Sequence, residues 1–405
     1  MRASVNGSRT TTFKLTALLG LLIAFAPFST DLFLAAFPRM AADMGVAVPQ
    51  VQLTLSVFFA GLALGQLAYG PLSDRCGRKK PLLAGIFIYI LASLGLTFCR
   101  DLNLFLLLRF FQAIGGCAGM VIARAVVRDS YDTRGGAKVL TVIMAVQSIG
   151  PVAAPVLGAY LISLTHWGFC FAFMTLLGIV CFFLVLFTLR ESLPRAKRVK
   201  SSFLSVIARG GRLCRDRNFI LVAVAGAVGG GSIFSFISGS PHVLMDYYGF
   251  TNTQYGWTFG IFSLGVALLS QLNLLFLKRF SARAILVGGL VATFATGGAL
   301  TLWAQIGGLP PTLPFLALLF FSLVSLPFIV ANSVALAMES CGENAGTASS
   351  LIGVLQFSAA ALVSSLLGVT EGWVALPMAF WIMACGLLPL FLLWPRGRAK
   401  PPLAA

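Results

Sequence analysis

Twelve long apolar runs dominate this sequence of 405 residues. Each run is close to the ~20 residues that an α-helix needs to cross a bilayer. Strands of a membrane barrel would instead alternate in polarity over ~10 residues. The pattern therefore predicts an all-α membrane protein with twelve transmembrane helices. The runs cover residues 15–37, 50–72, 81–99, 104–126, 138–161, 169–189, 219–241, 254–277, 284–304, 314–337, 346–369 and 373–394.

The composition agrees with a lipid-facing surface. The chain is 58% hydrophobic and 10% charged, whereas a soluble domain has about 25% charged residues to cover its surface. The basic start followed by an apolar run resembles a secretory signal. Because that run is long enough to span a membrane, we interpret it as a retained first helix.

The distribution of basic residues predicts the domain organisation and the orientation. The longest polar joint, residues 190–218, carries nine basic residues and two acids. It divides the chain into an N-terminal six-helix half (1–189), a basic linker (190–218) and a C-terminal six-helix half (219–405). With the N-terminus inside, 26 of the 29 Lys and Arg residues fall in cytoplasmic segments or at the adjoining helix ends. The positive-inside rule then predicts that both termini are cytoplasmic.

Several other classes of protein fit the sequence poorly. The net charge is +17, but the basic residues cluster in short loops between apolar runs. A nucleic-acid-binding protein would instead carry them on one basic domain. A Walker motif needs a Gly-Lys pair and the chain has none, so the energy for any transport must come from an ion gradient. Neither H-E-x-x-H nor G-x-S-x-G occurs, which argues against an intramembrane enzyme. A receptor would need a longer soluble loop. The only histidines, His166 and His242, look isolated in predicted loops, so we expect no metal site.

Two charges are expected well inside predicted spans, Asp31 in the first and Arg109 in the fourth. At ~1.5 Å per residue, both lie at the same depth, roughly 8–9 Å on the outer side of the midplane. Burial of a carboxylate favours its protonated form, and a nearby cation favours its ionised form. Relative movement of the two residues would therefore exchange a proton, although a fixed salt bridge is the alternative. Gln112, three residues after Arg109 on the same helix face, is expected to join a polar patch toward the substrate cavity or to bond a neighbouring helix.

The joint after the second run is dense in turn-forming and charged residues. It contains Gly70, Asp74, Arg75, Gly77 and Arg78. One interpretation is control of topology by positive charge alone. The more specific interpretation is an ionic latch in which Asp74 and the arginines hold neighbouring helix ends together. Gly70 and Gly77 would then allow the close approach and the tight turn.

The fifth run contains two prolines among small residues: Gly150, Pro151, Pro155 and Gly158. A proline inside a helix removes a hydrogen bond and bends the helix. Small side chains allow close contact between helices in a membrane. The segment is therefore expected to act as a gate or seal between helices, or as a static kink.

Three of these segments resemble motifs of the major facilitator superfamily, and within it of the drug:proton antiporters of the bicyclomycin-resistance (Bcr/CflA) branch. Residues 70–79 are similar to the superfamily motif G-x-L-x-D-R-x-G-R-[KR]. Residues 108–113 resemble the helix 4 motif whose Arg is implicated in proton coupling. Residues 154–159 resemble the antiporter motif of helix 5. Ala113 and Ala159 stand where these motifs carry Gly.

The resemblance covers nearly the whole chain and implies a function. It implies a monomeric, multi-pass exporter of the bacterial inner membrane that exchanges small molecules or drugs for protons, as in multidrug efflux and antibiotic resistance. It implies no cofactor beyond the proton gradient. Proton-coupled uptake, or export of one specific metabolite, stays open as the alternative; the helix 5 motif argues against uptake. The substrate cannot be chosen from the sequence.

Overall fold

The computed structural model describes residues 9–131, 133–198, 210–339, 341–342, 345–369 and 376–393, nearly all of them helical. The elements up to the central linker are α1 (Arg9–Asp31), η1 (Leu34–Ala36), α2 (Phe37–Met44), α3 (Val48–Cys76), α4 (Lys79–Phe98), α5 (Leu102–Ser130), α6 (Thr133–Leu164), α7 (Gly168–Thr188) and η2 (Arg195–Lys197). Those after it are α9 (Arg217–Pro241), η3 (His242–Tyr247), α10 (Asn252–Leu269), α11 (Leu272–Phe276), α12 (Ala282–Gly307), α13 (Thr312–Val324), α14 (Leu326–Met338), α15 (Ala345–Val369) and α16 (Pro377–Leu393).

Eleven of the twelve predicted spans are confirmed as long apolar helices. Eleven helical stretches of the described chain are long and apolar enough to cross a membrane. The twelfth predicted run corresponds to α16, which has 17 residues and is shorter than the others. Residues 370–375, in the joint before α16, lie outside the described part of the chain, as does the middle of the predicted linker, 199–209.

The first span is interrupted, which differs from the continuous helix predicted over 15–37. α1 ends at Asp31, the short 3₁₀ segment η1 follows, and α2 begins at Phe37. Pro38 explains the interruption because a proline has no N–H to donate to the preceding turn, yet it fits the first turn of a new helix. Asp31 therefore lies at a helix end instead of inside a continuous helix.

Local sequence fixes other helix ends. The Asp101 side chain accepts a hydrogen bond from the Leu104 N–H at 2.8 Å and so caps α5. Thr251 and Gln254 form a capping box at the start of α10. Gly45 ends α2 in the left-handed conformation, with φ of 67°, where Gly carries no steric cost.

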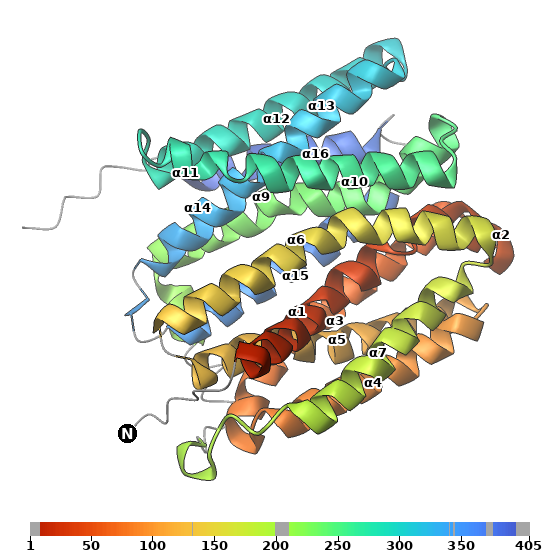
Figure 1. Ribbon diagram of the computed structural model, residues 1–405. Coiled ribbons are helices and arrows are strands. Elements are labelled where there is room, and N and C mark those ends of the chain that lie inside the picture. The colour runs from red at the N-terminus through yellow and green to blue at the C-terminus, as the bar shows by residue number, and fades with distance from the viewer. Residues whose placement is uncertain are drawn as a thin grey trace, which may run out of the picture.

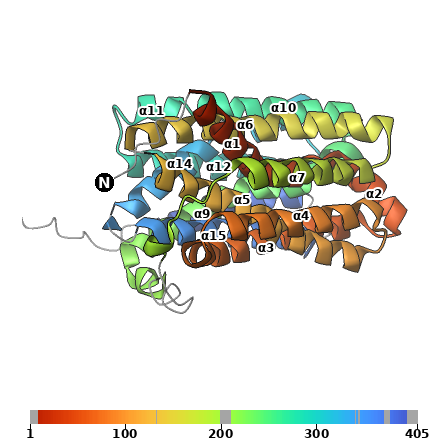
Figure 2. The same ribbon diagram turned by 60° about the horizontal axis from the view of Figure 1, so that its bottom comes forward.

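The helices run side by side in one bundle (Figures 1 and 2). In Figure 1, α11 lies at the left end of the bundle and α2 lies at the right end. Arg283 donates to the Leu393 carbonyl at 3.1 Å, which places the end of α16 beside the start of α12. α3 packs on α15 and α6 packs on α10, so these two pairs join the earlier helices to the later ones.

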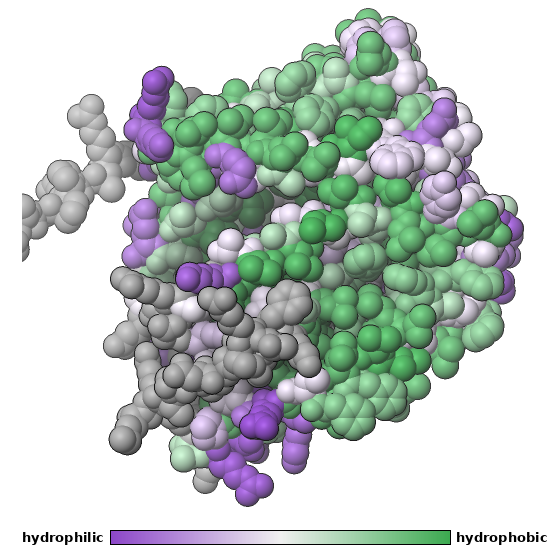
Figure 3. Space-filling model, in the orientation of Figure 1, coloured by the Kyte–Doolittle hydropathy of each residue, from purple (hydrophilic) through white to green (hydrophobic). Residues whose placement is uncertain are grey.

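The surface carries an apolar belt. Figure 3 shows hydrophobic side chains across the middle of the visible face and hydrophilic ones toward its two ends. Large apolar side chains such as Ile306 and Phe187 are 85% and 78% exposed. Such exposure over so many helices is that of a surface covered by lipid.

Both histidines have acidic partners, so the expectation that they are isolated is wrong. His166, in the turn before α7, lies 2.8 Å from the Asp43 carboxylate. His242 lies 2.7 Å from the Asp246 carboxylate. His242 also begins the π-helical segment η3 rather than lying in a loop, because the seventh span continues past its predicted end at residue 241.

Candidate functional site

Arg109 lies in α5 and is completely buried. Its Nη1 donates to the Ser29 carbonyl at 2.9 Å and to Gln112 Oε1 at 2.6 Å. The guanidinium carbon lies 4.7 Å from the centre of the Phe33 ring and 4.1 Å from that of Phe58. Stacking against aromatic rings favours a cation in an apolar interior. The Arg109 charge is therefore held between α1, α3 and α5.

Gln112 and Ser29 extend this cluster to α4. Gln112 Nε2 donates to Ser93 Oγ at 2.8 Å, and Ser29 Oγ lies 2.8 Å from the Tyr89 hydroxyl. Gln112 thus bonds Arg109 and also a neighbouring helix, as one of the two sequence interpretations predicted. The polar groups of this cluster bond one another across α1, α4 and α5.

Asp31 lies close in depth to Arg109, as the sequence predicted, since Arg109 bonds the carbonyl of Ser29 two residues earlier. Asp31 is 2% exposed, and its Oδ1 has no hydrogen-bond partner among the described residues. Within the same residues, Asp31 and Arg109 form no ion pair, and the Arg109 Nε and Nη2 also have no partner. A fixed salt bridge between the two is therefore excluded in this conformation.

The small residues of α6 contact two different helices. A Cβ atom on Gly158 would overlap the Leu32 carbonyl oxygen of the first span. A Cβ atom on Gly256 of α10 would lie 2.9 Å from the Pro155 carbonyl oxygen of α6. Gly150 is equally confined, since its Cβ would meet Pro27 at 2.8 Å. α6 runs as one helix through both prolines, and its small residues let the first span and α10 approach it closely.

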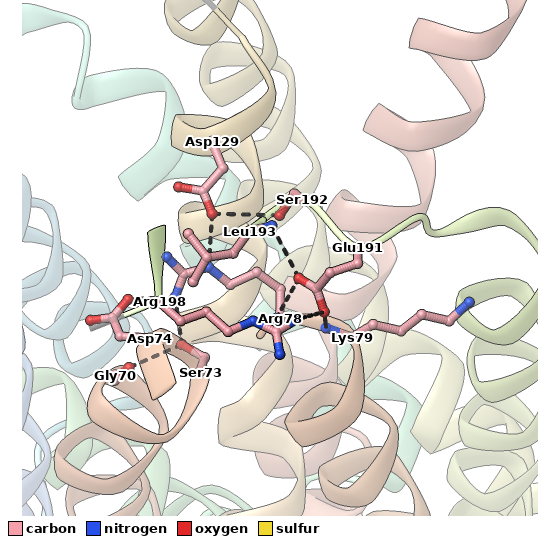
Figure 4. Close-up of polar contacts among 10 residues, drawn as sticks. All are labelled: Gly70, Ser73, Asp74, Arg78, Lys79, Asp129, Glu191, Ser192, Leu193 and Arg198. Atoms are coloured by element: carbon pink, nitrogen blue, oxygen red, sulfur yellow. Dashed lines mark hydrogen bonds and ion pairs between the residues drawn. The ribbon is translucent and has the colours of Figure 1, made fainter. Parts of the chain in front are cut away.

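The predicted latch is centred on Arg78 (Figure 4). Its Nε donates to Asp129 at the end of α5 at 2.8 Å. Its Nη1 donates to Ser73 at 2.8 Å and to Asp74 at 2.6 Å. The Arg78 side chain is 3% exposed, so these bonds satisfy a buried guanidinium. Arg78 ties the ends of α3 and α5 together, and Asp74 acts by holding Arg78.

Glu191 is the latch residue that sequence reasoning missed. Its Oε1 accepts from the Arg78 backbone N–H at 2.8 Å, and its Oε2 accepts from the Lys79 N–H at 3.3 Å. A carboxylate at a helix start satisfies unpaired N–H groups and favours the helix dipole. The beginning of the linker therefore caps α4. The sequence did hold a signal for this role, since Glu191 is one of only two acidic residues in the basic joint 190–218.

The charge of Glu191 is stabilised at this position. Burial raises the pKa of Glu191, but backbone N–H groups of Arg78, Leu193 and Lys79, together with the Arg198 charge, outweigh burial and lower the pKa below its ordinary value of 4.5. Arg198 lies 3.8 Å from the carboxylate. Glu191 is thus ionised whenever the surroundings are near neutral.

The two glycines of the latch differ. Gly77 has φ of 90°, and a Cβ there would overlap the Glu191 carboxylate and lie 2.7 Å from Arg198. Gly77 therefore provides both the turn and the close approach. For Gly70 the expectation is wrong, because no described atom lies within 4 Å of its Cβ position; only its carbonyl takes part, accepting from Ser73. Arg75 points to the exposed side.

Comparison with known proteins assigns the family. Residues 19–364 match the family described as Major Facilitator Superfamily. The uncharacterized MFS-type transporter YdgK of Bacillus subtilis is 33% identical over 90% of each chain. The bicyclomycin resistance protein homolog of Haemophilus influenzae is 33% identical over 92% of this chain and 94% of its own.

Solved structures agree on the fold. The crystal structure of a D-xylose-proton symporter superimposes with a TM-score of 0.71 over 96% of this chain and 98% of its own, at 13% identity. At this identity the likeness shows the shared fold alone. The chain belongs to the major facilitator superfamily, in the Bcr/CflA branch of the bicyclomycin resistance homolog, and is a multi-pass transporter of the bacterial inner membrane.

Proposed function

We propose that this protein exports small molecules of the antibiotic type across the bacterial inner membrane in exchange for protons. One observation carries the proposal: Asp31 is a buried carboxylate at membrane depth with an unpartnered oxygen, close to the level of the buried Arg109 cluster. Ionisable groups inside a membrane are costly and mark ion or substrate pathways. The relative named for bicyclomycin resistance, 33% identical, supports drug export.

The proposed architecture has twelve crossings, with α16 as the last. Both termini would be cytoplasmic, in agreement with the positions of 26 of the 29 basic residues. Two halves, 1–189 and 219–405, would rock about the α3–α15 and α6–α10 contacts, joined by the linker 190–218. The functional unit would be a monomer, driven by the proton gradient without a bound cofactor.

Proton exchange would occur at Asp31. A cation that comes close to the Asp31 carboxylate favours its ionised form, and this influence falls with distance. Arg109 is held by Ser29, Gln112 and two aromatic rings, whereas Asp31 lies at the helix end where the first span is interrupted. Both residues lie in the N-terminal half, so movement of the interrupted first span within that half would change the distance of Asp31 from the Arg109 cation.

The latch and α6 would set which side is open. Arg78, Asp129 and Glu191 join the ends of α3, α4 and α5 to the start of the linker, so this end of the first half would move as a unit. The small residues of α6 would seal the contact with α10. Uptake by proton symport is the second candidate, and the likeness of the α6 segment to the antiporter motif favours export.

Accumulation of drugs in cells tests the proposal. A host without its own exporters would express the protein and be loaded with a bicyclomycin-like compound, a phenicol or a sulfonamide. We expect lower accumulation of at least one compound than in cells with an empty vector, and recovery of accumulation when an uncoupler removes the proton gradient. Higher accumulation that depends on the gradient would support uptake instead.

A further inference from the structure

Three helices meet at the level of Asp31. The residue after it, Leu32, presents its carbonyl oxygen to Gly158 of α6 with no room for a Cβ atom between them. α6 also presents the Pro155 carbonyl to Gly256 of α10, again without room for a side chain. The segment η1, which begins three residues past Asp31, packs on α10 as well. The α6 motif thus holds the end of α1 and the start of α10 close together.

Tyr255, next to Gly256, is the polar side chain that α10 places at this junction. It is completely buried, and its hydroxyl lies 3.0 Å from Ser240 Oγ of α9. The segment η1, which follows Asp31, packs on α9 as well as on α10. When Ser240 is the donor in their hydrogen bond, the Tyr255 O–H remains available to donate elsewhere. Asp31 Oδ1 has no partner among the described residues.

We propose that Tyr255 is a positioning residue for the proton on Asp31: it donates a hydrogen bond to the ionised carboxylate from the opposite half and loses this role when Asp31 is protonated. The inference rests on the proposed proton exchange at Asp31. A donor stabilises a carboxylate and has no comparable effect on the neutral acid. Loss of a proton from Asp31 would therefore strengthen the contact between α1 and α10, and gain of a proton would weaken it.

The other groups around Asp31 leave this role to Tyr255. α5 contributes Arg109, which bonds Ser29 and Gln112, and α4 contributes Tyr89, which bonds Ser29. α7 contributes Cys170, whose thiol is directed to the Leu32 carbonyl at 3.7 Å. α6 carries only Lys138 and Tyr160 as titratable residues among its described side chains, at its start and on its exposed face. α9 has none between Arg217 and His242.

Infrared difference spectroscopy tests this inference without any substrate. The purified full-length protein is titrated with acid and base, and the carboxylic C=O band that is absent from Asp31→Asn reports the protonation of Asp31. In Tyr255→Phe we expect the midpoint of this band to move to higher pH by about one to two units, since a hydrogen bond to a charged group is lost. An unchanged midpoint, or no Asp31 band at all, would overturn the inference.

Matched variants separate this effect from general damage. Tyr160→Phe removes a hydroxyl from a residue that is 57% exposed on α6, and its Asp31 midpoint should equal that of the unmodified protein. An equal shift in Tyr160→Phe would also contradict the inference. If Tyr255→Phe does not fold, the intact protein with isotopically labelled tyrosine replaces it. A pH-dependent tyrosine band should then vanish in Asp31→Asn, and its persistence would count against the inference.

Because the titration needs no transport, it distinguishes two failures. Normal coupling of Asp31 and Tyr255 without drug-dependent proton flux would contradict the proposed function and leave the inference standing. Drug-dependent proton flux with no effect of Tyr255→Phe on the midpoint would contradict the inference alone.

Discussion

Glu191 accepts a hydrogen bond from the backbone N–H of Arg78 at 2.8 Å, although 113 residues separate them. The same carboxylate accepts from Lys79, so a residue at the start of the linker completes the first turn of α4. The Arg78 side chain meanwhile bonds Asp129 at the end of α5. One residue thus connects the linker through its backbone and the neighbouring helix through its side chain. The start of the linker is therefore coupled to the latch through Arg78.

Replacing Glu191 tests this coupling. Glu191→Gln keeps the shape but removes the charge, and we expect a loss of about 1 kcal/mol in the free energy of unfolding. Because the pKa of Glu191 is lowered in the folded protein, its stabilisation is present above the ordinary pKa of 4.5 and is lost as the pH falls through the folded value. Thermal unfolding in detergent from neutral to acidic pH should show the two proteins converging in acid. A constant difference at all pH values would contradict the assignment.

Replacing each of the two latch glycines by alanine should change the stability of the protein in different ways. Gly77→Ala should destabilise the protein by about 1–3 kcal/mol, because its φ of 90° is strained for alanine and the Cβ would overlap Glu191. Gly70 lies inside α3, and no described atom of another residue lies within 4 Å of the position that a Cβ would take there. Gly70→Ala should therefore leave the free energy of unfolding unchanged or raise it by about 0.5–1 kcal/mol. The midpoints of thermal unfolding of the two variants test this expectation. Equal changes in Gly77→Ala and Gly70→Ala would contradict it.

Arg78 and Arg75 provide a second matched pair. Arg78→Lys keeps the charge but cannot donate to Asp129, Ser73 and Asp74 from one planar group. We expect a loss of about 2 kcal/mol in stability, from two or more hydrogen bonds. Arg75→Lys, on the exposed side of the same turn, should change little. Similar losses in both variants, measured by unfolding, would mean that positive charge alone matters here.

The contact of α6 with the first span predicts a steric effect. Gly158→Ala would force α6 away from the Leu32 carbonyl, and we expect a loss of about 1–3 kcal/mol together with reduced export. Gly288→Ala in α12 is the control, since no described atom lies within 4 Å of its Cβ position. Unfolding midpoints and drug accumulation check both variants. Full export by Gly158→Ala would show that the close approach is dispensable.

Local periodicity predicted part of the site correctly. Residues three apart share a helix face, and Arg109 does bond Gln112 at 2.6 Å. The rise per residue placed Arg109 and Asp31 at similar depths, and the bond from Arg109 to Ser29 confirms this. Both inferences needed only the geometry of a single helix and the thickness of a bilayer.

Contacts between distant segments could not be predicted in the same way. Nothing local relates Glu191 to Arg78, because the bond depends on how the end of α7 returns to the start of α4. The interruption after Asp31 was missed for another reason. A continuous apolar run reports that a segment lies in lipid, and it does not report whether the backbone stays helical. Pro38 was the available signal for the break.

The central claim is that Asp31 exchanges a proton for exported drug. The most direct measurement is the internal pH of energised, inside-out membrane vesicles when candidate drugs are added, with the intact protein compared with Asp31→Asn. We predict that at least one drug makes the vesicle interior more alkaline with the intact protein and that this response is lost in Asp31→Asn. An equal response in both proteins would contradict the claim for Asp31. Absence of any response from folded protein would contradict drug antiport itself.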